Sequence, residues 1–522
     1  MEINYSLMPQ DIIALQDTLL PTLREVGVNR IWTTDSLTGR TVADDATFSA
    51  SKAILDQQGF DSSGFGSVVV GHPGNSLNPD DPTLDLTVPA NWRYRVDRHG
   101  KPVYFCADIE PNMMADNTAA VRRMRKLGYT TFSADDDLRM GNWGDAIQGC
   151  FCDKCLADFN QRVGFTYSRR EIAQAIEQLD DRTLLEAWVA YNCSKVERLM
   201  DALADEIDHI GLMVMHMGDE RHGLNLPKLR AQHPDMFFRV GEMYFSDADY
   251  GTIAGKIDLL AGISQHLTAV GRRRSYSETT IFPPRALSPE HWVHKARLTL
   301  AAGTENLFFM GGTWIIEDRY WHAMAAAMPG LRRIEALSKP KHRYPIHMVS
   351  GTDGTRGETI HPPALPLRAG LPVLSVRGSV IPKGGEILLA LGSYDLTGPW
   401  EAALGNYRAI ICDQDALAAN PQLAERATVV LNASLRESGT SHLELLRSHL
   451  ARLEPNYPRI SAGQDLALFW VGERVLILNL LPEPNRGVLT YGASRVPIEL
   501  GALAIGTVSL DGQSAGSCEV IQ

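Results

Sequence analysis

Two groups of acidic residues in this sequence have the types and positions that acid/base or nucleophilic chemistry requires. One is the run Asp135, Asp136 and Asp137 in SADDDL, and the other is Glu278 in SYSETT. Three adjacent carboxylates repel one another unless a substrate, a metal ion or another cation shares the site. Cleavage of a glycosidic bond uses a pair of carboxyl groups, about 5 to 5.5 Å apart in retaining enzymes. Without such a role, each aspartate would be a loop or helix-cap residue, and Glu278 would pair with the arginines at 272–274.

A cluster of cysteines indicates a metal site. Cys150, Cys152 and Cys155 stand in CFCDKC, and Cys106 in VYFCADIEPN could supply a fourth thiolate. Zn²⁺ prefers four such ligands in a tetrahedron, which leaves no open position, so we expect a structural zinc ion and no organic cofactor. Buried cysteines are often only small apolar side chains, but three thiols within six residues favour the metal.

The elements that must position these residues are eight strand-like segments that alternate with amphipathic helical stretches. This alternation predicts an α/β fold in which a (β/α)8 barrel occupies residues 1–340. Beyond residue 340 the pattern of strand-like and helical segments changes. This change predicts a smaller α/β domain at 341–460 and a small β-sandwich at 461–522. The expected barrel strands are 2–7, 29–35, 66–71, 129–135, 212–217, 237–244, 275–280 and 306–312.

Function in such barrels collects at the C-terminal ends of the strands. The aspartate run ends the fourth predicted strand, and Glu278 lies at the end of the seventh. Further polar or aromatic residues near strand ends are expected to contact a polyhydroxylated ligand, although each alone is more often structural. With the orienting carboxylate Asp135, these candidates are His216, Glu242, Tyr244, Trp314 and Asp318.

Composition excludes several classes of protein. The chain has 522 residues, is 44% hydrophobic and 21% charged, and carries a formal net charge of -12. A negative charge without a basic tract argues against nucleic-acid binding. The N-terminus lacks the pattern of a signal peptide, and no run of about 18 apolar residues predicts a membrane helix. We therefore expect a cytoplasmic protein with no nucleic-acid or membrane partner.

Several segments resemble the family-42 glycoside hydrolases, which are β-galactosidase-like enzymes of the retaining clan A. SADDDLRMGNWGDAIQGCFCDKC has the layout of the family's strand-four Asn-Glu followed by CxCxxC, and RVDRHGKPVYFC matches its earlier cysteine. SYSETTIFPPRALSPEHW follows the plan of the segment that carries the family's nucleophile. The resemblance implies that Glu278 is the nucleophile, that Asp137 or Asp136 replaces the acid/base Glu, and that the chain forms a homo-oligomer, often a trimer.

The leading hypothesis is a retaining exo-glycosidase that acts on a small oligosaccharide or glycoside. In this hypothesis Asp137 is the general acid/base, with Asp136 the second choice. Because Asp is one methylene shorter than Glu, an inverting enzyme with room for a water, at a separation of about 6.5 to 9.5 Å, is an alternative. Two further alternatives are a non-catalytic carbohydrate-binding barrel and a metal-dependent lyase or isomerase in which the aspartates bind a divalent cation.

Overall fold

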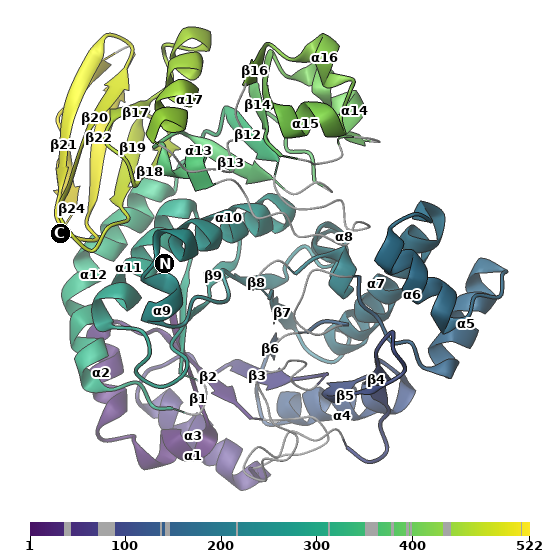
Figure 1. Ribbon diagram of the computed structural model, residues 1–522. Helices are drawn as coiled ribbons and strands as arrows, with labels where there is room; N and C mark the ends of the chain where they lie inside the picture. The colour runs from purple at the N-terminus through teal and green to yellow at the C-terminus, as the bar shows by residue number, and fades with distance from the viewer. Residues whose placement is uncertain are drawn as a thin grey trace.

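Figure 1 shows the fold of the chain in a computed structural model. The structure describes residues 1–35, 43–70, 89–135, 138–140, 147–215, 218–311, 314–349, 364–376, 380–392, 396, 399–431, 440–512 and 514–521. Parallel strands form a ring with helices around it, and three smaller sheets follow along the described part of the chain.

The ring is a (β/α)8 barrel, as predicted. Its sheet has the order β10-β11-β1-β2-β3-β6-β7-β8-β9, and neighbouring strands are parallel. β9 and β10 are the two parts of the seventh barrel strand, separated only by Glu278, and they pair with the sixth and eighth strands respectively. The barrel strands are β1 Ile3–Leu7, β2 Arg30–Thr34, β3 Gly64–Val68, β6 Thr131–Asp135, β7 His209–Met213, β8 Phe237–Val240, β9 Ser275–Ser277, β10 Thr279–Thr280 and β11 Leu307–Met310.

The strands differ in extent from the sequence-based expectation, most of all β3, β7 and β8. β3 begins at Gly64, where the expected start was residue 66, and β7 begins at His209, where the expected start was residue 212. β8 ends at Val240, whereas the strand was expected to continue to residue 244. β8 stops because Gly241, Met243 and Tyr244 have positive φ angles of 81°, 75° and 58°, which no extended strand contains. Glu242 and Tyr244 therefore lie in a turn beyond the strand.

Helices surround the barrel, and their ends follow local sequence signals. α11 illustrates this, because Pro289 is its first residue, the side chain of Ser288 accepts from the His291 N–H, and Gly303 ends it with a φ of 108°. The helices of the barrel region are α1 Pro9–Ala14, α2 Leu19–Val26, α3 Asp45–Gln57, α4 Pro111–Lys126, α5 Asp153–Val163, α6 Arg169–Gln178, α7 Arg182–Ala204, η1 Glu220–His222, α8 Leu226–Gln232, α9 Asp247–Tyr250, α10 Ile253–Val270, α11 Pro289–Ala302 and α12 Asp318–Ser338.

Aromatic rings pack together on the barrel strands. Trp32, Phe237, Tyr276 and Phe308 form one buried cluster, in which the Trp32 and Phe308 rings stack with centroids 5.5 Å apart. A Cβ atom at Gly211 would lie 2.4 Å from the Phe237 ring, so the strand needs glycine to admit this side chain. The rings form a packed apolar layer, beyond which Arg239 and the other polar groups described below lie.

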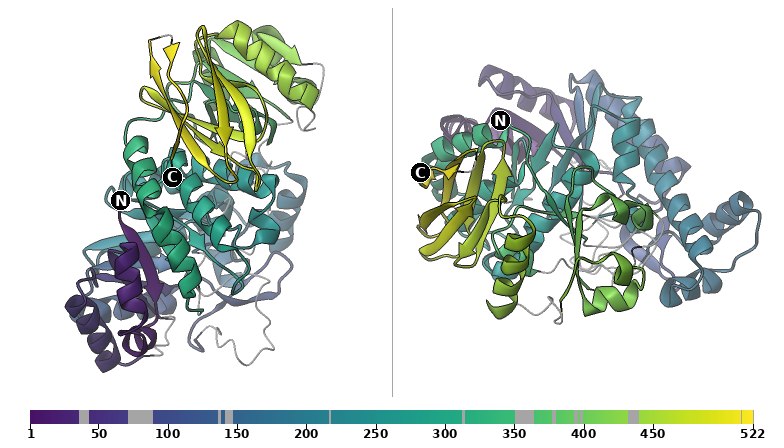
Figure 2. Two further views of the ribbon diagram at one scale, coloured as in Figure 1. Left: turned by 90° about the vertical axis from the view of Figure 1, so that its left-hand side faces the viewer. Right: turned by 90° about the horizontal axis from the view of Figure 1, so that it is seen from above.

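Three smaller sheets follow the barrel (Figure 2). The first is parallel with the order β13-β12-β14-β15-β16, and it belongs to the expected α/β domain. The rest of the chain forms antiparallel pairs around β18-β19-β22 and β17-β20-β21, as expected for a small β-domain. The elements are β12 Ile346–Val349, α13 Ala364–Arg368, β13 Val373–Val376, β14 Ile387–Ala390, α14 Pro399–Ala403, η2 Leu404–Asn406, β15 Ala409–Asp413, α15 Gln414–Ala419, α16 Leu423–Arg426, β16 Val429–Leu431, α17 Thr440–Leu453, β17 Arg459–Ala462, β18 Leu466–Val471, β19 Arg474–Asn479, β20 Asn485–Tyr491, β21 Ser494–Leu500, β22 Ile505–Asp511, β23 Ser514–Ala515 and β24 Glu519–Ile521.

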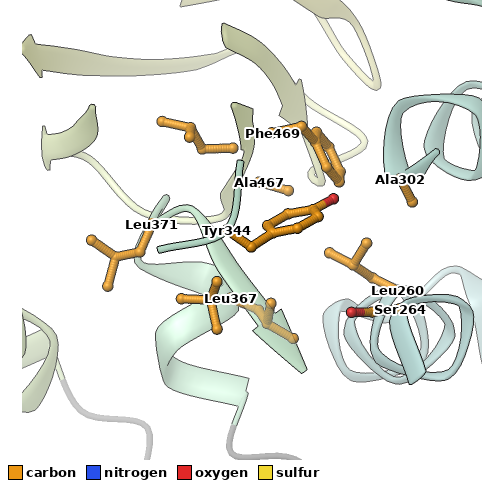
Figure 3. A pocket seen from close by; sticks show the side chains of 10 residues that line it. Leu260, Ser264, Ala302, Tyr344, Leu367, Leu371, Ala467 and Phe469 are labelled. Atoms are coloured by element: carbon orange, nitrogen blue, oxygen red, sulfur yellow. The ribbon is translucent and has the colours of Figure 1, made fainter. Parts of the chain in front are cut away.

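The barrel and the later sheets share an apolar contact region. Figure 3 shows Tyr344 between Phe469 of β18 and Leu260 of α10, where only about 10 Å³ is open to water, roughly the space of a single molecule. His294 of α11 also reaches the β-domain, since its Nε2 lies 3.1 Å from the Asn479 carbonyl oxygen. Among the helices that the structure describes, none combines the length and apolar character needed to cross a membrane.

Another strand pair lies outside the barrel sheet. β4 (Tyr94–Val96) and β5 (Pro102–Ala107) form an antiparallel hairpin between β3 and α4. This hairpin carries residues toward the cysteine cluster, which is described in the next subsection.

Candidate functional site

The C-terminal ends of three barrel strands bring together two carboxylates and one guanidinium. Asp135 is the last residue of β6, Arg239 is on β8, and Glu278 lies between β9 and β10. Arg239 Nη1 lies 2.5 Å from Asp135 Oδ1, and its Nη2 forms an ion pair with Glu278 Oε2. Arg239 therefore joins the ends of the fourth and seventh strands, where the sequence predicted functional carboxylates.

This group is buried. The relative exposure is 4% for Asp135, 0% for Arg239 and 2% for Glu278. The Arg239 guanidinium also lies over the Phe308 ring, 4.0 Å from its centroid, so the charged plane rests on the aromatic layer of the barrel. Water screens ion pairs little in a buried environment, and the energy of such pairs depends strongly on their geometry.

Opposing effects set the protonation of Glu278. Burial raises its pKa and the Asp135 charge adds to this, whereas Arg239, a hydrogen bond from Thr280 and the charge of Lys295 lower it. The net direction is upward. Thr280 Oγ1 donates to Glu278 Oε1, so both carboxylate oxygens have a defined neighbour.

The other predicted substrate-binding residues are distributed around the same end of the barrel. Glu242 is buried and Tyr244 is half-buried in the turn after β8. Trp314 is half-buried and lies edge-on to Tyr320, with centroids 5.7 Å apart. Asp318 is exposed in the first turn of α12, where its charge suits the helix dipole. Asp136, Asp137 and His216 lie outside the described residues.

An open pocket of about 480 Å³ lies between the segments that follow the sixth, seventh and eighth strands. Asp247, Arg285, Arg319 and Tyr320 are among its lining residues. The Arg285 guanidinium lies 5.7 Å from the Trp314 ring centroid, which places this predicted aromatic residue next to the pocket. Charged and aromatic groups together can contact the hydroxyls and the apolar faces of a sugar.

The cysteine cluster forms as predicted, with a different fourth member. Asp108, Cys150, Cys152 and Cys155 place one ligand atom each within 4.8 Å of one another. The sequence suggested Cys106 as the fourth ligand, whereas the structure brings Asp108 there. Cys106 lies inside β5, where the strand sets its side-chain direction, and its Sγ contacts the Ala107 carbonyl oxygen at 3.7 Å.

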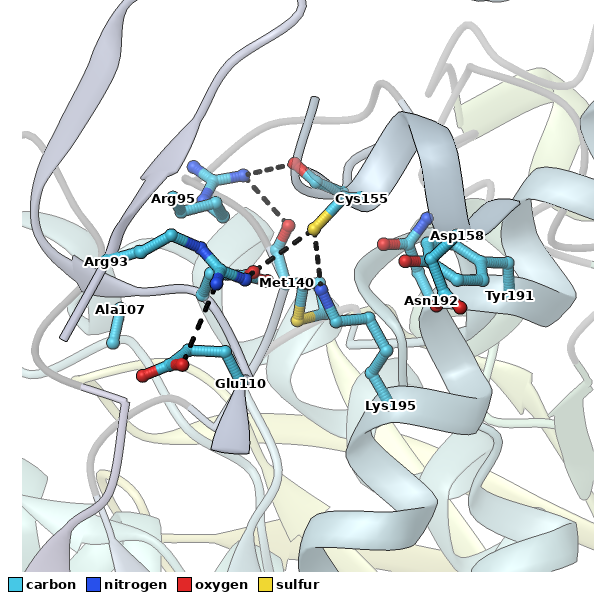
Figure 4. A network of polar contacts seen from close by, with 12 residues as sticks. Arg93, Arg95, Ala107, Glu110, Met140, Cys155, Asp158, Tyr191, Asn192 and Lys195 are labelled. Atoms are coloured by element: carbon cyan, nitrogen blue, oxygen red, sulfur yellow. Dashed lines mark hydrogen bonds and ion pairs between the residues drawn. The ribbon is translucent and has the colours of Figure 1, made fainter. Parts of the chain in front are cut away.

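Two cations contact the Asp108 carboxylate. Figure 4 shows these two side chains, Arg93 and Lys195, together with Cys155. Arg93 Nη2 donates to Asp108 Oδ2 at 2.7 Å, and Lys195 of α7 forms an ion pair with Oδ1. Lys195 also donates to Cys155 Sγ at 3.1 Å. Burial alone would lower the pKa of Lys195, but the charges of Asp108 and Cys155 raise it overall, so the side chain is an ammonium.

The donor set fits a divalent metal ion with a preference for sulfur. Hydrogen bonds among the thiols lower the pKa of Cys152 and raise that of Cys150. A hydrogen bond with Cys150 lowers the pKa of Cys155, but one with Cys152 and burial raise it on balance, so Cys152 is the thiol shifted toward the thiolate form that a metal needs. Three thiolates and a carboxylate would give the bound ion an excess of negative charge, and Lys195 and Arg93 lie where they offset it.

Sequence reasoning missed six contributors to these two sites. They are Arg239, Lys295, Thr280, Asp108, Lys195 and Arg93. Arg239 had a detectable signal, because an arginine in the apolar strand FFRV must have a partner when that strand is buried. Lys195 and Lys295 lie in ordinary helical patterns, and nothing local distinguishes them from surface lysines.

The fold defines a class, that of barrel proteins with the architecture of solved β-galactosidases. The structure matches the β-galactosidase from the psychrophilic Marinomonas ef1 with a TM-score of 0.66 and 10% identity. The match covers 98% of this chain and 100% of the β-galactosidase chain. The β-galactosidase from Halorubrum lacusprofundi matches with a TM-score of 0.66 and 11% identity, covering 99% and 100% of the two chains.

A family-42 β-galactosidase from G. stearothermophilus, solved as a catalytic mutant, matches with a TM-score of 0.61 and 9% identity over 96% of this chain and 97% of that chain. No protein-family model matches the sequence. No curated protein matches it either. At such low identities the likeness concerns the fold, and it confirms the architecture expected from the family resemblance.

Proposed function

We propose that this protein is a glycoside hydrolase that acts on a small oligosaccharide or glycoside with retention of configuration. The observation that carries the proposal is the buried group in which Arg239 joins Asp135 and Glu278 at the C-terminal end of the barrel. Such an arrangement holds the Glu278 carboxylate in a defined orientation, and the Arg239 charge favours the ionised form that a nucleophile requires, against the effect of burial.

In the proposed reaction, Glu278 attacks the anomeric carbon while the bond to the leaving oxygen breaks. A carboxylic acid protonates that oxygen, and we assign this role to Asp137, with Asp136 as the second choice. The glycosyl ester on Glu278 is then hydrolysed by a water whose proton returns to the same aspartate. Asp135 would orient Arg239 and, through it, Glu278.

The surrounding polar and aromatic groups are proposed to bind the sugar. Glu242 and Tyr244 lie in the turn after β8, and Trp314 lies beside the open pocket of about 480 Å³. We propose that this pocket receives one or two sugar rings of a short substrate that is cleaved in an exo-acting manner. Its lining residues include Arg285, Arg319 and Tyr320.

We propose that the cysteine cluster binds a structural Zn²⁺ through Asp108, Cys150, Cys152 and Cys155. When bound, the ion would join the hairpin β4–β5 to the N-terminus of α5 by four strong bonds. A cytoplasmic location and a homo-oligomer, a trimer by resemblance, are part of the same proposal. Light scattering of the purified protein measures the oligomer directly.

The experiment is hydrolysis of a panel of aryl glycosides by the wild type, by Glu278→Ala and by Glu197→Ala. Glu197 of α7 is a matched control because it is also a buried carboxylate. Its Oε2 pairs with Lys228 Nζ of α8 at 2.6 Å. Cleavage by the wild type and Glu197→Ala, loss in Glu278→Ala and recovery of a glycosyl azide on addition of azide support Glu278 as nucleophile.

Other results favour the alternatives. A product whose anomeric configuration is inverted in the first NMR spectra would identify an inverting enzyme. Loss of activity on adding a chelator, with the fold intact, would favour a metal-dependent lyase or isomerase. Sugar binding by calorimetry without turnover of any substrate would instead favour a non-catalytic carbohydrate-binding barrel.

A further inference from the structure

The turn that follows β8 has an unusual backbone. Gly241, Met243 and Tyr244 all have φ in the left-handed region, at 81°, 75° and 58°. Glycine adopts this conformation freely, whereas methionine and tyrosine adopt it at a cost in energy. The side chain of Glu242, one of the predicted site residues, projects from the middle of this turn. Other contacts must therefore hold the turn in its conformation.

One buried side chain makes those contacts. Lys295 of α11 is fully buried, and its Nζ donates to the Met243 carbonyl oxygen at 2.8 Å and lies 3.4 Å from that of Tyr244. The same nitrogen lies 5.1 Å from the centroid of the Phe245 ring. A single ammonium thus contacts three successive residues of the turn.

Charged neighbours connect Lys295 with the proposed active site. Burial lowers its pKa to about 7, and the charges of Glu278 and Glu242 act in the opposite direction. Lys295 in turn lowers the pKa of Glu278. The other charged groups near Glu278 are Arg239 from β8 and Asp135 from β6.

Two further titratable neighbours, Tyr244 and His294, have partners of their own. Tyr244 interacts with Asp258 of α10. His294, next to Lys295 on α11, directs its two nitrogens to the Tyr250 hydroxyl and the Asn479 carbonyl oxygen. Lys295 therefore contacts the turn from α11, and its charge acts on Glu278 through space.

We propose that Lys295 is a positioning residue that holds the turn 241–245 in place beside Glu278. The Glu278 N–H donates to the carbonyl oxygen of Val240, just before the turn, at 2.8 Å. The catalytic consequence of this role rests on the proposed glycosidase function. An ammonium suits this role because it offers three donors and no acceptor, and because its charge favours both carbonyl oxygens and a carboxylate.

The chain contains a matched control. Lys256 of α10 is also fully buried, donates to the Gly251 carbonyl oxygen at 3.1 Å, and lies 5.4 Å from the Tyr250 ring centroid. Burial lowers its pKa to about 8, but the neighbouring carboxylate is Asp247 and not Glu278. Replacement of either lysine by methionine keeps the alkyl stem and removes the donors and the charge.

The test compares Lys295→Met with Lys256→Met by amide hydrogen exchange and by kinetics on an aryl glycoside that the wild type cleaves. We expect faster exchange at 241–246 in Lys295→Met only. We also expect kcat to fall on the order of 100-fold there, with KM little changed, because a misplaced site loses reactivity before binding. The acid limb of kcat/KM should move to higher pH, since Glu278 loses a positive neighbour.

Unchanged exchange at 241–246 in Lys295→Met would overturn the proposal, and so would a kcat and pH profile that match those of Lys256→Met. If Lys295→Met does not fold, Lys295→Gln is used in its place, because glutamine keeps a hydrogen-bond donor and removes the charge. Hydrogen exchange needs no substrate. If the wild type cleaves no glycoside, the glycosidase proposal fails separately, and exchange still shows whether Lys295 holds the turn.

Discussion

Arg239 pairs with Glu278 in the interior of the barrel, and the guanidinium of this pair has no exposure to solvent. The pair joins the sixth strand to the point where the seventh strand is divided into β9 and β10. A buried ion pair contributes little net stability compared with an apolar pair, but removal of one partner leaves a charge without compensation. The pair is therefore a sensitive point for both stability and the proposed chemistry.

The first prediction concerns Arg239→Met. This change leaves the buried carboxylates Asp135 and Glu278 without their shared cation, so we expect the free energy of unfolding to fall by about 3–5 kcal/mol. Urea denaturation measures the change. The control is Arg273→Met, because Arg273 and Asp235 form an exposed pair and its loss should cost about 0–1 kcal/mol. Equal losses in the two variants would show that Arg239 is not a buried bridge.

The second prediction concerns the hydrogen bond from Thr280 to Glu278. Thr280→Val keeps the shape of the side chain and removes the donor, so the pKa of Glu278 should rise further. Because the ionised form is the proposed nucleophile, the acid limb of kcat/KM should move to higher pH. Thr279→Val is the control, since the Thr279 hydroxyl bonds to that of Ser277 at 2.6 Å and not to Glu278. A shift of the same size in both variants would contradict the assignment.

The third prediction separates the two candidates for the fourth metal ligand. Asp108 lies with the three cysteines, so Asp108→Ala should lower the zinc content of the purified protein more than Cys106→Ser does. Lys195→Met should lower zinc affinity roughly 10–100-fold, because it removes a group that orients a ligand. Zinc is measured by elemental analysis and by competition with a chelating dye.

Cys193→Ser is the control for the metal experiment, since Cys193 is buried on α7 and its Sγ contacts the Glu220 carbonyl oxygen at 3.5 Å, away from the cluster. Its zinc content should equal that of the wild type. Zinc loss in Cys106→Ser with full retention in Asp108→Ala would restore the ligand set that the sequence suggested.

The fourth prediction concerns stability in acid. Burial lowers the pKa of His347 from 6.5 to about 4. Between these values the unfolded chain binds a proton that the folded chain does not, so the free energy of unfolding falls as pH decreases from about 6.5 to 4. One such group contributes about 1.4 kcal/mol per pH unit within the window. His347→Gln should therefore show a shallower decline than the wild type in denaturation series at fixed pH values.

His322→Gln is the matched control, because His322 is exposed on α12 whereas His347 lies buried 2.9 Å from the Tyr407 hydroxyl. It should reproduce the wild-type decline. If both variants gave the same curve as the wild type, burial of His347 would not be the cause of acid sensitivity.

Local patterns in the sequence were sufficient to predict the barrel, because a buried parallel strand and an amphipathic helix each leave a distinct periodicity. The end of β8 was predicted wrongly, since apolar and polar residues continue to alternate through Glu242 and Tyr244 while the backbone turns. Periodicity reports which faces are apolar, and it does not report the sign of φ.

The site was predictable in part for the same reason. Glu278 and Asp135 could be placed at strand ends, and three of the four metal-site residues could be placed by their spacing in CFCDKC. The predicted roles of Asp136, Asp137 and His216 stay predictions, as these residues lie outside the described part of the chain.

By itself, the sequence determined the order of strands and helices, the positions of carboxylates at strand ends and the clustering of three thiols, because all of these depend on neighbours along the chain. Only the tertiary structure decided that Arg239 bridges Asp135 and Glu278, that Asp108 and not Cys106 joins the cysteines, and that Lys295 holds the turn after β8. These relationships join residues that are far apart in sequence. They depend on side-chain directions that are set only when the barrel closes.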